Sequence, residues 1–324
     1  MNTKEQLLAL FEQNRGTYFS GETLAEQLQI SRTAVWKAVN ALRGDGYPIV
    51  AAQNKGYALA PHSDILSAAG VEKYLAGAAA DVSVHVIPTV DSTNTRVKEI
   101  AGSGEPEGYV LIASQQTAGR GRRGHSFFSP EGTGVYLSIL LRPHYASAEQ
   151  ASALTTMAAV AVCEAIEDVS DSRAQIKWVN DVFIGSRKVC GILTEASFSM
   201  EDGSLEYAVL GVGINAVTPE GGFPEEIRDI AAAVFSEPAD DGKNRLAAAF
   251  LNRFMAIYTD PDPSAYVERY RRRCMVIGRE VQVISPTETR TALALDVDSA
   301  CRLIVRFPDG HEETLFSGEI RVKL

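Results

Sequence analysis

The sequence lacks the features that mark secreted, membrane-spanning and metal-binding proteins. It has four cysteines, with no Cys-x-x-Cys pair and no histidine at zinc-ligand spacing. Two of them, Cys163 and Cys190, lie in apolar runs, which predicts buried reduced thiols. No apolar run approaches the ~20 residues needed to span a bilayer, and Met1–Gln6 is polar rather than the start of a signal core. We therefore expect a cytoplasmic protein that has no membrane contact and no metal held by its own side chains.

Positive charge is also scarce. The chain has 31 lysines and arginines against 41 aspartates and glutamates, a formal net charge of -10, which excludes non-specific nucleic-acid binding by the molecule as a whole. Residues 1–60 differ, because six basic and five acidic side chains give them +1 and leave -11 for the rest. A length of 324 residues predicts more than one domain, and the charge difference indicates that the N-terminal part has a separate role.

The first sixty residues have the pattern of three short helices followed by a hairpin. Thr3 begins a capping-box spacing before an amphipathic run, and Ser20 and Ser31 are suited to cap a second and a third helix. Apolar residues then alternate from Tyr47 to Ala60, as in two short strands. This order predicts a winged helix-turn-helix domain over residues 1–62, whose third helix docks in the major groove of DNA.

One face of the expected third helix is polar and basic, whereas the other is an apolar row that faces inward. We expect DNA to be contacted by the following residues: Gly21, Ser31, Arg32, Thr33, Trp36, Lys37, Asn40 and Lys55. The alternative is a small docking or regulatory module, because such folds also bind proteins. A single copy with a charge of only +1 binds a lone site weakly, and dimerisation on a two-fold site would compensate.

The stretch from Gln115 to Gly124 combines positive charge with little side-chain bulk. It contains three arginines and three glycines: Arg120, Arg122 and Arg123 with Gly119, Gly121 and Gly124. Glycine lets a backbone approach a ligand closely, and guanidinium groups suit carboxylate and phosphate oxygens. The stretch matches neither a Walker loop nor a dinucleotide fingerprint. It predicts a loop that closes over a small anion, and the alternative is a flexible basic surface loop.

Two further segments carry polar residues where a ligand site is expected. A strand at 82–87 leads to Ser92, Thr93 and Asn94 at a helix start, where free N–H groups and hydroxyls can hold a polar ligand or simply cap the helix. Ile176–Ile184 reads as one apolar strand that contains charged and amide side chains, which are costly to bury unpaired. Those side chains are Lys177, Asn180 and Asp181; the alternative is that Lys177 and Asp181 pair, or that the strand is an exposed edge. The next two strands carry glycines that leave room for a ligand, Gly191, Gly211 and Gly213.

The last fifty residues contain four alternating segments, at 275–284, 290–297, 302–307 and 313–322, with a tight turn at Asp309-Gly310. They predict a small SH3-like β-barrel. The domains expected from the whole sequence are therefore 1–62, 63–272 and 273–324.

Five motifs occur in the order in which biotin protein ligases carry them. They are Asp91–Asn94, Gly119–Gly124, Lys177–Asp181, Lys188–Leu193 and Gly211–Asn215. The chain resembles that family and, with its N-terminal module, the family's bifunctional ligase and biotin-operon repressor form. The resemblance implies an α+β protein with a central mixed-sheet α/β domain of class II synthetase-like type. It departs from the family at Val179, where proline is usual, and at Phe127, where some members pack the adenine with tryptophan.

The resemblance implies two reactions: biotin and ATP give biotinyl-5′-AMP, and the biotinyl group passes to a lysine of biotin carboxyl carrier protein, with Mg²⁺ on the phosphates. The implied catalytic residues are Lys177, Arg120, Arg122 and Asp181. The implied biotin-binding residues are Ser92, Thr93, Asn94, Gln116, Arg120, Gly121, Arg122 and Lys177. The implied nucleotide-binding residues are Arg122, Phe127, Asn180 and Asn215.

The resemblance also implies regulation. With biotinyl-AMP bound, the chain would form a homodimer that represses biotin synthesis and transport genes at operator DNA. Two other functions remain open. One is a transcriptional sensor without catalysis, which the retention of Lys177, Asn180 and Asp181 disfavours. The other is a related acyl-adenylating enzyme such as a lipoate ligase, which the three-arginine loop disfavours.

Overall fold

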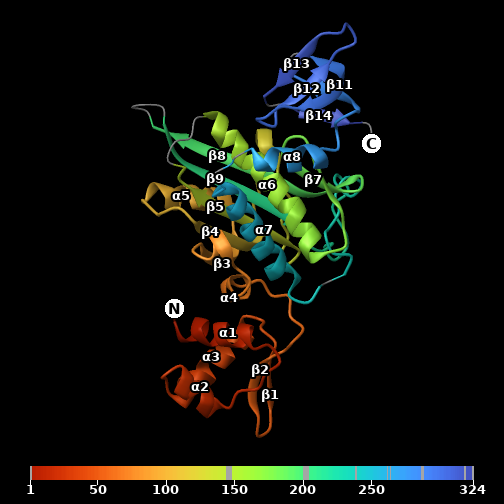
Figure 1. Cartoon of the computed structure of the whole chain (residues 1–324). Coiled ribbons are helices and arrows are strands. Elements are labelled where there is room, and N and C mark those ends of the chain that lie inside the picture. Colours follow the sequence, from red (N-terminus) through yellow and green to blue (C-terminus); the bar gives the residue numbers. More distant parts are fainter. Residues whose placement is uncertain are drawn as a thin grey trace.

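The computed structural model describes residues 2–143, 148–199, 204–237, 239–260, 262, 264–285, 288–316 and 319–322. Three units follow one another, from the N-terminal helices at one end of the molecule to the C-terminal strands at the other (Figure 1). Within these described ranges, none of the helices combines the length and the hydropathy needed to cross a membrane. All four cysteines are buried and free, which confirms the prediction made for Cys163 and Cys190.

The N-terminal unit has the predicted three helices and hairpin. Its elements are α1 (Thr3–Gln13), α2 (Gly21–Gln27), α3 (Arg32–Gly44), β1 (Ile49–Ala52) and β2 (Gly56–Leu59). The hydroxyls of Ser20 and Ser31 cap α2 and α3, since they accept hydrogen bonds from the next turn at 3.0 and 3.1 Å. The predicted cap of α1 at Thr3 is wrong by one residue. Asn2 accepts from the Glu5 N–H and its own N–H donates to the Glu5 carboxylate, which completes a capping box one position earlier.

The central unit is built on a seven-stranded mixed sheet in the order β3-β4-β5-β9-β8-β7-β6. Only β3 and β4 pair in parallel among these neighbours. The strands are β3 (Ser83–Val90), β4 (Tyr109–Gln116), β5 (Gly134–Leu141), β6 (Ala174–Lys177), β7 (Asp181–Ile184), β8 (Arg187–Phe198) and β9 (Leu205–Asn215). The central strands are long and apolar because helices cover both of their faces.

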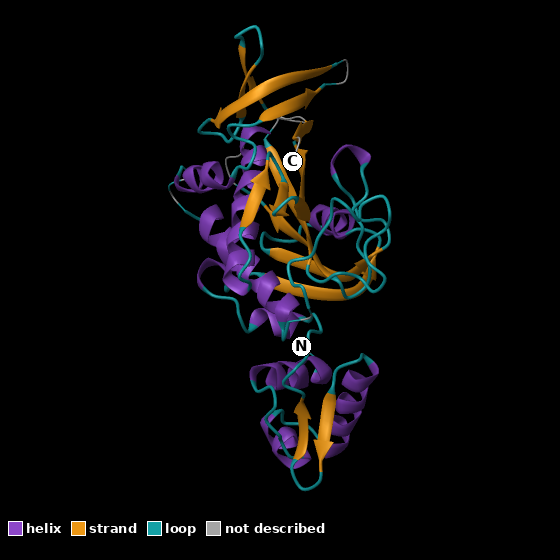
Figure 2. Ribbon diagram, turned by 90° about the vertical axis from the view of Figure 1, so that its right-hand side faces the viewer, coloured by secondary structure: helices purple, strands orange, loops and turns teal. Residues whose placement is uncertain are grey.

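Helices lie on the two faces of this sheet (Figure 2). They are α4 (Ala68–Glu72), α5 (Thr93–Gly102), α6 (Ala148–Val169), α7 (Gly242–Tyr258) and α8 (Ala265–Arg273), with two short 3₁₀ turns, η1 (Gly77–Ala79) and η2 (Arg122–Gly124). The main core fills the space between the sheet and the pair α6 and α7. On the opposite face, α5 packs Val97 and Ala101 onto Leu111, Leu140 and Val209. The start of α5 therefore lies against the middle strands of the sheet on this second face.

The prediction of one strand over Ile176–Ile184 is wrong. The stretch is a tight hairpin of β6 and β7, and the peptide between Trp178 and Val179 in its turn is cis. Both turn residues are buried. The Trp178 indole donates to the Cys301 carbonyl at 2.9 Å, and the Val179 carbonyl accepts from the Tyr270 hydroxyl at 3.1 Å. Because the turn packs its apolar side chains into the core, its sequence looks like the interior of a strand.

The C-terminal unit is a small five-stranded antiparallel sheet in the order β13-β12-β11-β10-β14. Its strands are β10 (Glu280–Ile284), β11 (Thr289–Val297), β12 (Leu303–Arg306), β13 (Glu312–Leu315) and β14 (Glu319–Val322). The expected strand at 313–322 is therefore two strands. Helix α8 holds this unit to the central one, since Arg271 pairs with Asp296 at 2.8 Å.

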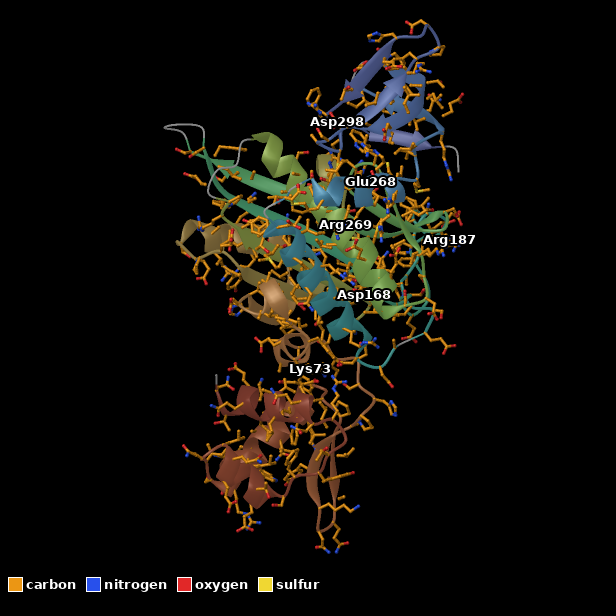
Figure 3. The ribbon with its side chains drawn as sticks, viewed as in Figure 1. Lys73, Asp168, Arg187, Glu268, Arg269 and Asp298 are labelled. Atoms are coloured by element: carbon orange, nitrogen blue, oxygen red, sulfur yellow. The ribbon has the colours of Figure 1, made fainter. Side chains whose placement is uncertain are left out.

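A buried group of four charges, the junction cluster, joins the N-terminal unit to the central unit. Glu12 lies at the end of α1 and Arg15 just after it, Lys73 follows α4, and Asp241 precedes α7. Arg15 contacts Glu12 and Asp241 at 2.7 Å each, and Lys73 contacts the same two carboxylates at 2.7 and 2.6 Å. Figure 3 labels Lys73 at this boundary. The segment between the two units is held too, because the Ser63 carbonyl accepts from Arg15 at 2.7 Å.

Candidate active site

The stretch with three arginines, from Gln115 to Gly124, is called the arginine loop below. A cavity of about 530 Å³ lies between this loop, the start of α5 and the sheet. It brings together most of the predicted ligand-site residues: Ser92, Thr93, Asn94, Gln116, Arg120, Gly121, Arg122, Phe127, Lys177, Asn180 and Asp181. Asn215 is not among the lining residues, and its side chain donates to the Ala232 carbonyl at 3.0 Å instead. The volume falls in the range of small-molecule sites, ~300–1,000 Å³.

Sheet register explains how residues so far apart in sequence meet. In the backbone register, Lys177 lies opposite Asp181, Asp181 opposite Gly191, and Gly191 opposite Gly213. All four therefore belong to one row across β6, β7, β8 and β9. Directly paired residues point to the same face of a sheet. The row therefore sets an ammonium and a carboxylate beside two positions without side chains.

The glycines leave space that this protein fills with its own side chains. A Cβ atom at Gly213 would lie 2.6 Å from the Phe127 ring, and one at Gly211 would lie 2.1 Å from the Asn94 amide oxygen. Phe127 also meets Tyr136 edge-on, with ring centroids 6.4 Å apart. Gly213 thus makes room for the Phe127 ring beside the sheet. An aromatic ring is a surface on which a planar group can stack.

The arginine loop is folded back on itself. The Gly121 N–H donates to the His125 carbonyl at 2.7 Å, and the Phe127 N–H donates to the Gly119 carbonyl at 2.9 Å. A Cβ at Gly119 would lie 2.4 Å from the Phe127 carbonyl oxygen, so this position requires glycine. Arg123 has φ 53°, in the left-handed region. The loop therefore has a defined shape over the cavity.

One bond fixes the end of the loop to the β6–β7 turn, and a second fixes that turn to β8. The Arg122 guanidinium donates to the Asn180 amide oxygen at 3.1 Å, and the Asn180 nitrogen donates to the Ile192 carbonyl at 2.9 Å. Burial, and then the charge of Arg123, lower the pKa of Arg122 below its ordinary value. An anionic ligand is attracted more strongly by such a half-buried cation than by one fully exposed to water.

Asp181 forms an ion pair with Lys188 at 2.7 Å. The Lys177 ammonium lies 5.8 Å from the centroid of the Phe183 ring, also on the cavity wall. Lys188 was missing from the predicted site residues. Its signal was present in the sequence, since it begins one of the five family motifs.

The start of α5 faces the cavity with a polar floor. Ser92 is the N-cap residue by position, yet its hydroxyl caps no backbone N–H among the described residues. Thr93 donates to the Gln116 amide oxygen through its N–H at 2.9 Å, and its hydroxyl lies 3.1 Å from the same oxygen. Gln116 in turn donates to Ser129 at 3.0 Å. The floor is therefore a hydrogen-bonded set rather than a simple helix cap.

The N-terminal unit presents the predicted polar face to solvent. Its members Arg32, Thr33, Trp36, Lys37 and Asn40 are exposed, whereas the opposite row of α3 is buried. Trp36 is 56% exposed, which is high for so large an apolar side chain. Lys55, at the hairpin tip, lies 5.9 Å from the Tyr18 ring. Of the two other predicted residues, Gly21 begins α2 and Ser31 uses its hydroxyl to cap α3.

Three parts of the chain match known protein families. Residues 3–58 match an HTH domain, residues 86–215 match the Biotin/lipoate A/B protein ligase family, and residues 276–322 match the biotin protein ligase C terminal domain. The fold and the cavity thus define a ligase of the biotin and lipoate class.

Individual relatives narrow this class. The bifunctional ligase/repressor BirA of Bacillus subtilis is 36% identical over 231 residues, 71% of this chain and 70% of that protein. BirA of Escherichia coli is 29% identical over 322 residues, 98% of this chain and 96% of that protein. A mutant biotin protein ligase from Aquifex aeolicus, solved in complex with biotin, is 26% identical and superimposes with a TM-score of 0.63, covering 74% and 98% of the two chains. The chain belongs to the biotin protein ligase family, in its bifunctional ligase/repressor form.

Proposed function

We propose that the chain activates biotin with ATP as biotinyl-5′-AMP and transfers the biotinyl group to a lysine of the biotin carboxyl carrier protein of acetyl-CoA carboxylase. One observation carries this proposal: Lys177 and the arginine loop line the same cavity as the polar floor at the start of α5. The biotin carboxylate is ionised at neutral pH, so its activation needs no base. It needs two anions held together and the charge at the α-phosphate stabilised.

In the first reaction a biotin carboxylate oxygen attacks the α-phosphorus of ATP, and pyrophosphate leaves. Lys177, Arg120 and Arg122 supply the positive charge at the forming acyl-phosphate junction. The biotin ring system is held by the polar floor and the loop: Ser92, Thr93, Asn94, Gln116 and Gly121. Phe127 stacks on the adenine, and Arg122 and Asn180 hold the nucleotide. For Asn215 a contact with the nucleotide requires its side chain to leave the Ala232 carbonyl.

In the second reaction the carrier lysine attacks the acyl carbon, and AMP leaves. Asp181 orients or deprotonates the incoming amine. Because Asp181 already pairs with Lys188 at 2.7 Å, the amine must share or replace that partner. Lys188 therefore sets how readily the carboxylate becomes available.

Mg²⁺ fits this site as an ion that arrives on the nucleotide. Among the described residues there is no group of three or more His, Cys, Asp or Glu side chains that could hold a metal. The cavity wall is cationic, so the phosphates themselves are the oxygen ligands that Mg²⁺ prefers. When bound, the ion neutralises phosphate charge.

The N-terminal domain represses genes of biotin synthesis and transport in the presence of biotinyl-AMP. In this proposal the domains are 1–62, 63–272 and 273–324, and the protein acts in the cytoplasm. Ordering of the arginine loop by biotinyl-AMP supplies the free energy that favours a homodimer. The homodimer has two exposed α3 faces, one from each copy, and these bind a two-fold operator.

The test is biotin-dependent exchange of labelled pyrophosphate into ATP by the purified chain, followed by mass spectrometry for retained biotinyl-AMP. Lipoate replaces biotin in a parallel reaction. Exchange that requires biotin and ignores lipoate is the expected result. No exchange with biotin would refute the ligase, and exchange with lipoate alone would identify a lipoate ligase.

A further inference from the structure

Glu195, on β8, lies behind the polar floor and contacts three groups. It accepts a hydrogen bond from the Asn94 amide at 3.0 Å, pairs with Lys98 at 3.1 Å and pairs with Arg120 of the loop at 3.2 Å. Its side chain is only 20% exposed. Burial raises the pKa of Glu195, but the bonds from Asn94 and Lys98 and the charge of Arg120 outweigh burial and lower it. The carboxylate is therefore ionised beneath two residues of the proposed biotin site.

An ionised carboxylate can only accept hydrogen bonds, and this fixes the amide of Asn94. The Asn94 nitrogen must face Glu195, with a second bond to the Leu193 carbonyl at 3.2 Å. The Asn94 oxygen must then face the fully buried Ser138, whose hydroxyl lies 2.6 Å from it.

The contacts continue to the loop. Ser138 gives its one hydroxyl proton to Asn94, so at 2.8 Å it accepts from the Thr93 hydroxyl. The Thr93 N–H donates to Gln116, and Gln116 donates to Ser129. The Ser129 hydroxyl donates to the Phe127 carbonyl at 2.9 Å. Glu195 thus begins a chain of hydrogen bonds that passes through the floor and ends at the loop.

Arg120 meets Glu195 from the other side. The Arg120 side chain is 47% exposed, so the pair is loose enough to exchange. A carboxylate ligand that enters the cavity offers the guanidinium a second partner of the same chemistry.

We propose that Glu195 is a positioning residue for the biotin site, which fixes the polarity of the Asn94 amide and holds Arg120 over the cavity until the ligand carboxylate binds. This inference rests on the proposed ligase function. Two consequences follow. The affinity for biotin depends on Glu195 more than the affinity for ATP does. The empty loop is held by Glu195, whereas the liganded loop is held by the ligand.

The test compares Glu195→Gln, which keeps the shape and removes the charge, with the matched control Glu206→Gln. Glu206 is an exposed carboxylate on β9 that accepts from Ser197. In biotin-dependent pyrophosphate exchange, Glu195→Gln should raise the KM for biotin by ~10-fold, the loss expected for one charged hydrogen bond. The KM for ATP should stay that of the control. Ser138→Ala, which breaks the chain beyond Asn94, should also raise the KM for biotin.

Trypsin gives a second readout, because it cleaves after the loop arginines. Without ligand, Glu195→Gln should be cleaved in the loop several times faster than Glu206→Gln; with saturating biotin and MgATP the two should be cleaved equally. Equal biotin KM values and equal ligand-free cleavage in the two variants would overturn the inference. Absence of exchange in the unmodified chain would instead refute the ligase function, so the two failures are distinguishable.

Discussion

Arg122 and Asn180 join the arginine loop to the sheet, with 3.1 Å between the guanidinium nitrogen and the amide oxygen. Asn180 cannot turn its amide over without losing the Ile192 carbonyl, which its nitrogen contacts at 2.9 Å. The oxygen that Arg122 needs is therefore held in place before any ligand binds.

Arg122→Gly should release biotinyl-AMP from the cavity and label bystander lysines, because the loop loses both its contact with Asn180 and a cation over the ligand. Asn180→Ala should give the same defect in weaker form. The measurement is the dissociation rate of the adenylate and the biotin content of added serum albumin. If the double variant is no worse than Arg122→Gly, the two residues act through their mutual bond; unchanged adenylate dissociation in Arg122→Gly would contradict the assignment.

Lys177→Ala should slow adenylate formation by at least ~100-fold, the loss seen when one preorganised charge donor is removed from a transition state. A single-turnover assay with biotin and MgATP measures this directly. Arg187→Ala is the control, since Arg187, labelled in Figure 3, is an exposed cation at the start of β8. It is not among the residues that line the cavity. Near-normal adenylate formation by Lys177→Ala would remove Lys177 from the mechanism.

Gly211→Ala should weaken biotin binding by ~10-fold or more, because the new methyl group would lie 2.1 Å from the Asn94 oxygen and must displace it. Gly102→Ala is the matched control in α5, where a Cβ meets nothing within 4 Å. The biotin Kd from calorimetry distinguishes them. Equal affinities would mean that Asn94 has room to move without loss of the ligand.

The sequence was sufficient for the motifs and insufficient for the contacts between them. Helix caps at Ser20 and Ser31 are local, and a hydroxyl before a helix identifies them. The turn at Trp178 was missed because its apolar residues are buried by Cys301 and Tyr270, more than ninety positions away in sequence. The role of Glu195 could not be predicted for a similar reason. Its partners Asn94, Lys98 and Arg120 are about 75 to 100 positions away in sequence and meet it only in the folded chain.

DNA affinity tests the exposed face of α3. Lys37→Ala should weaken binding of the full chain, with biotin and MgATP, to DNA fragments that it selects from a random pool. It should also reduce the slope of log affinity against log salt by ~1, as for the loss of one phosphate contact. Lys4→Ala is the control, because Lys4 lies on α1 and pairs with Asp45 at 2.8 Å. Identical salt slopes for the two variants would exclude Lys37 from the interface.

The free energy of unfolding depends on pH through Asp241, one of the four residues of the junction cluster. Burial alone raises the pKa of Asp241, but bonds from Lys73, Asn244 and Tyr74 and the charge of Arg15 outweigh it and lower the pKa. A lowered pKa means that the ionised carboxylate stabilises the folded chain. That stabilisation is complete above the ordinary aspartate pKa of ~3.9 and is lost as the pH falls below it.

Asp241→Asn should lower the free energy of unfolding at pH 7 by ~3 kcal/mol, because it leaves Lys73 and Arg15 with Glu12 as their remaining carboxylate in a buried site. Asparagine tolerates the left-handed conformation of this residue, φ 56°, so the backbone is not the cause. Urea unfolding from pH 7 to pH 3 should show the difference from the unmodified chain shrinking below pH 4. Asp240→Asn is the neighbouring control, since Asp240 pairs with an exposed His62 and should change stability by less than ~1 kcal/mol. A deficit in Asp241→Asn that stays constant down to pH 3 would show that the carboxylate charge is not what holds the two units together.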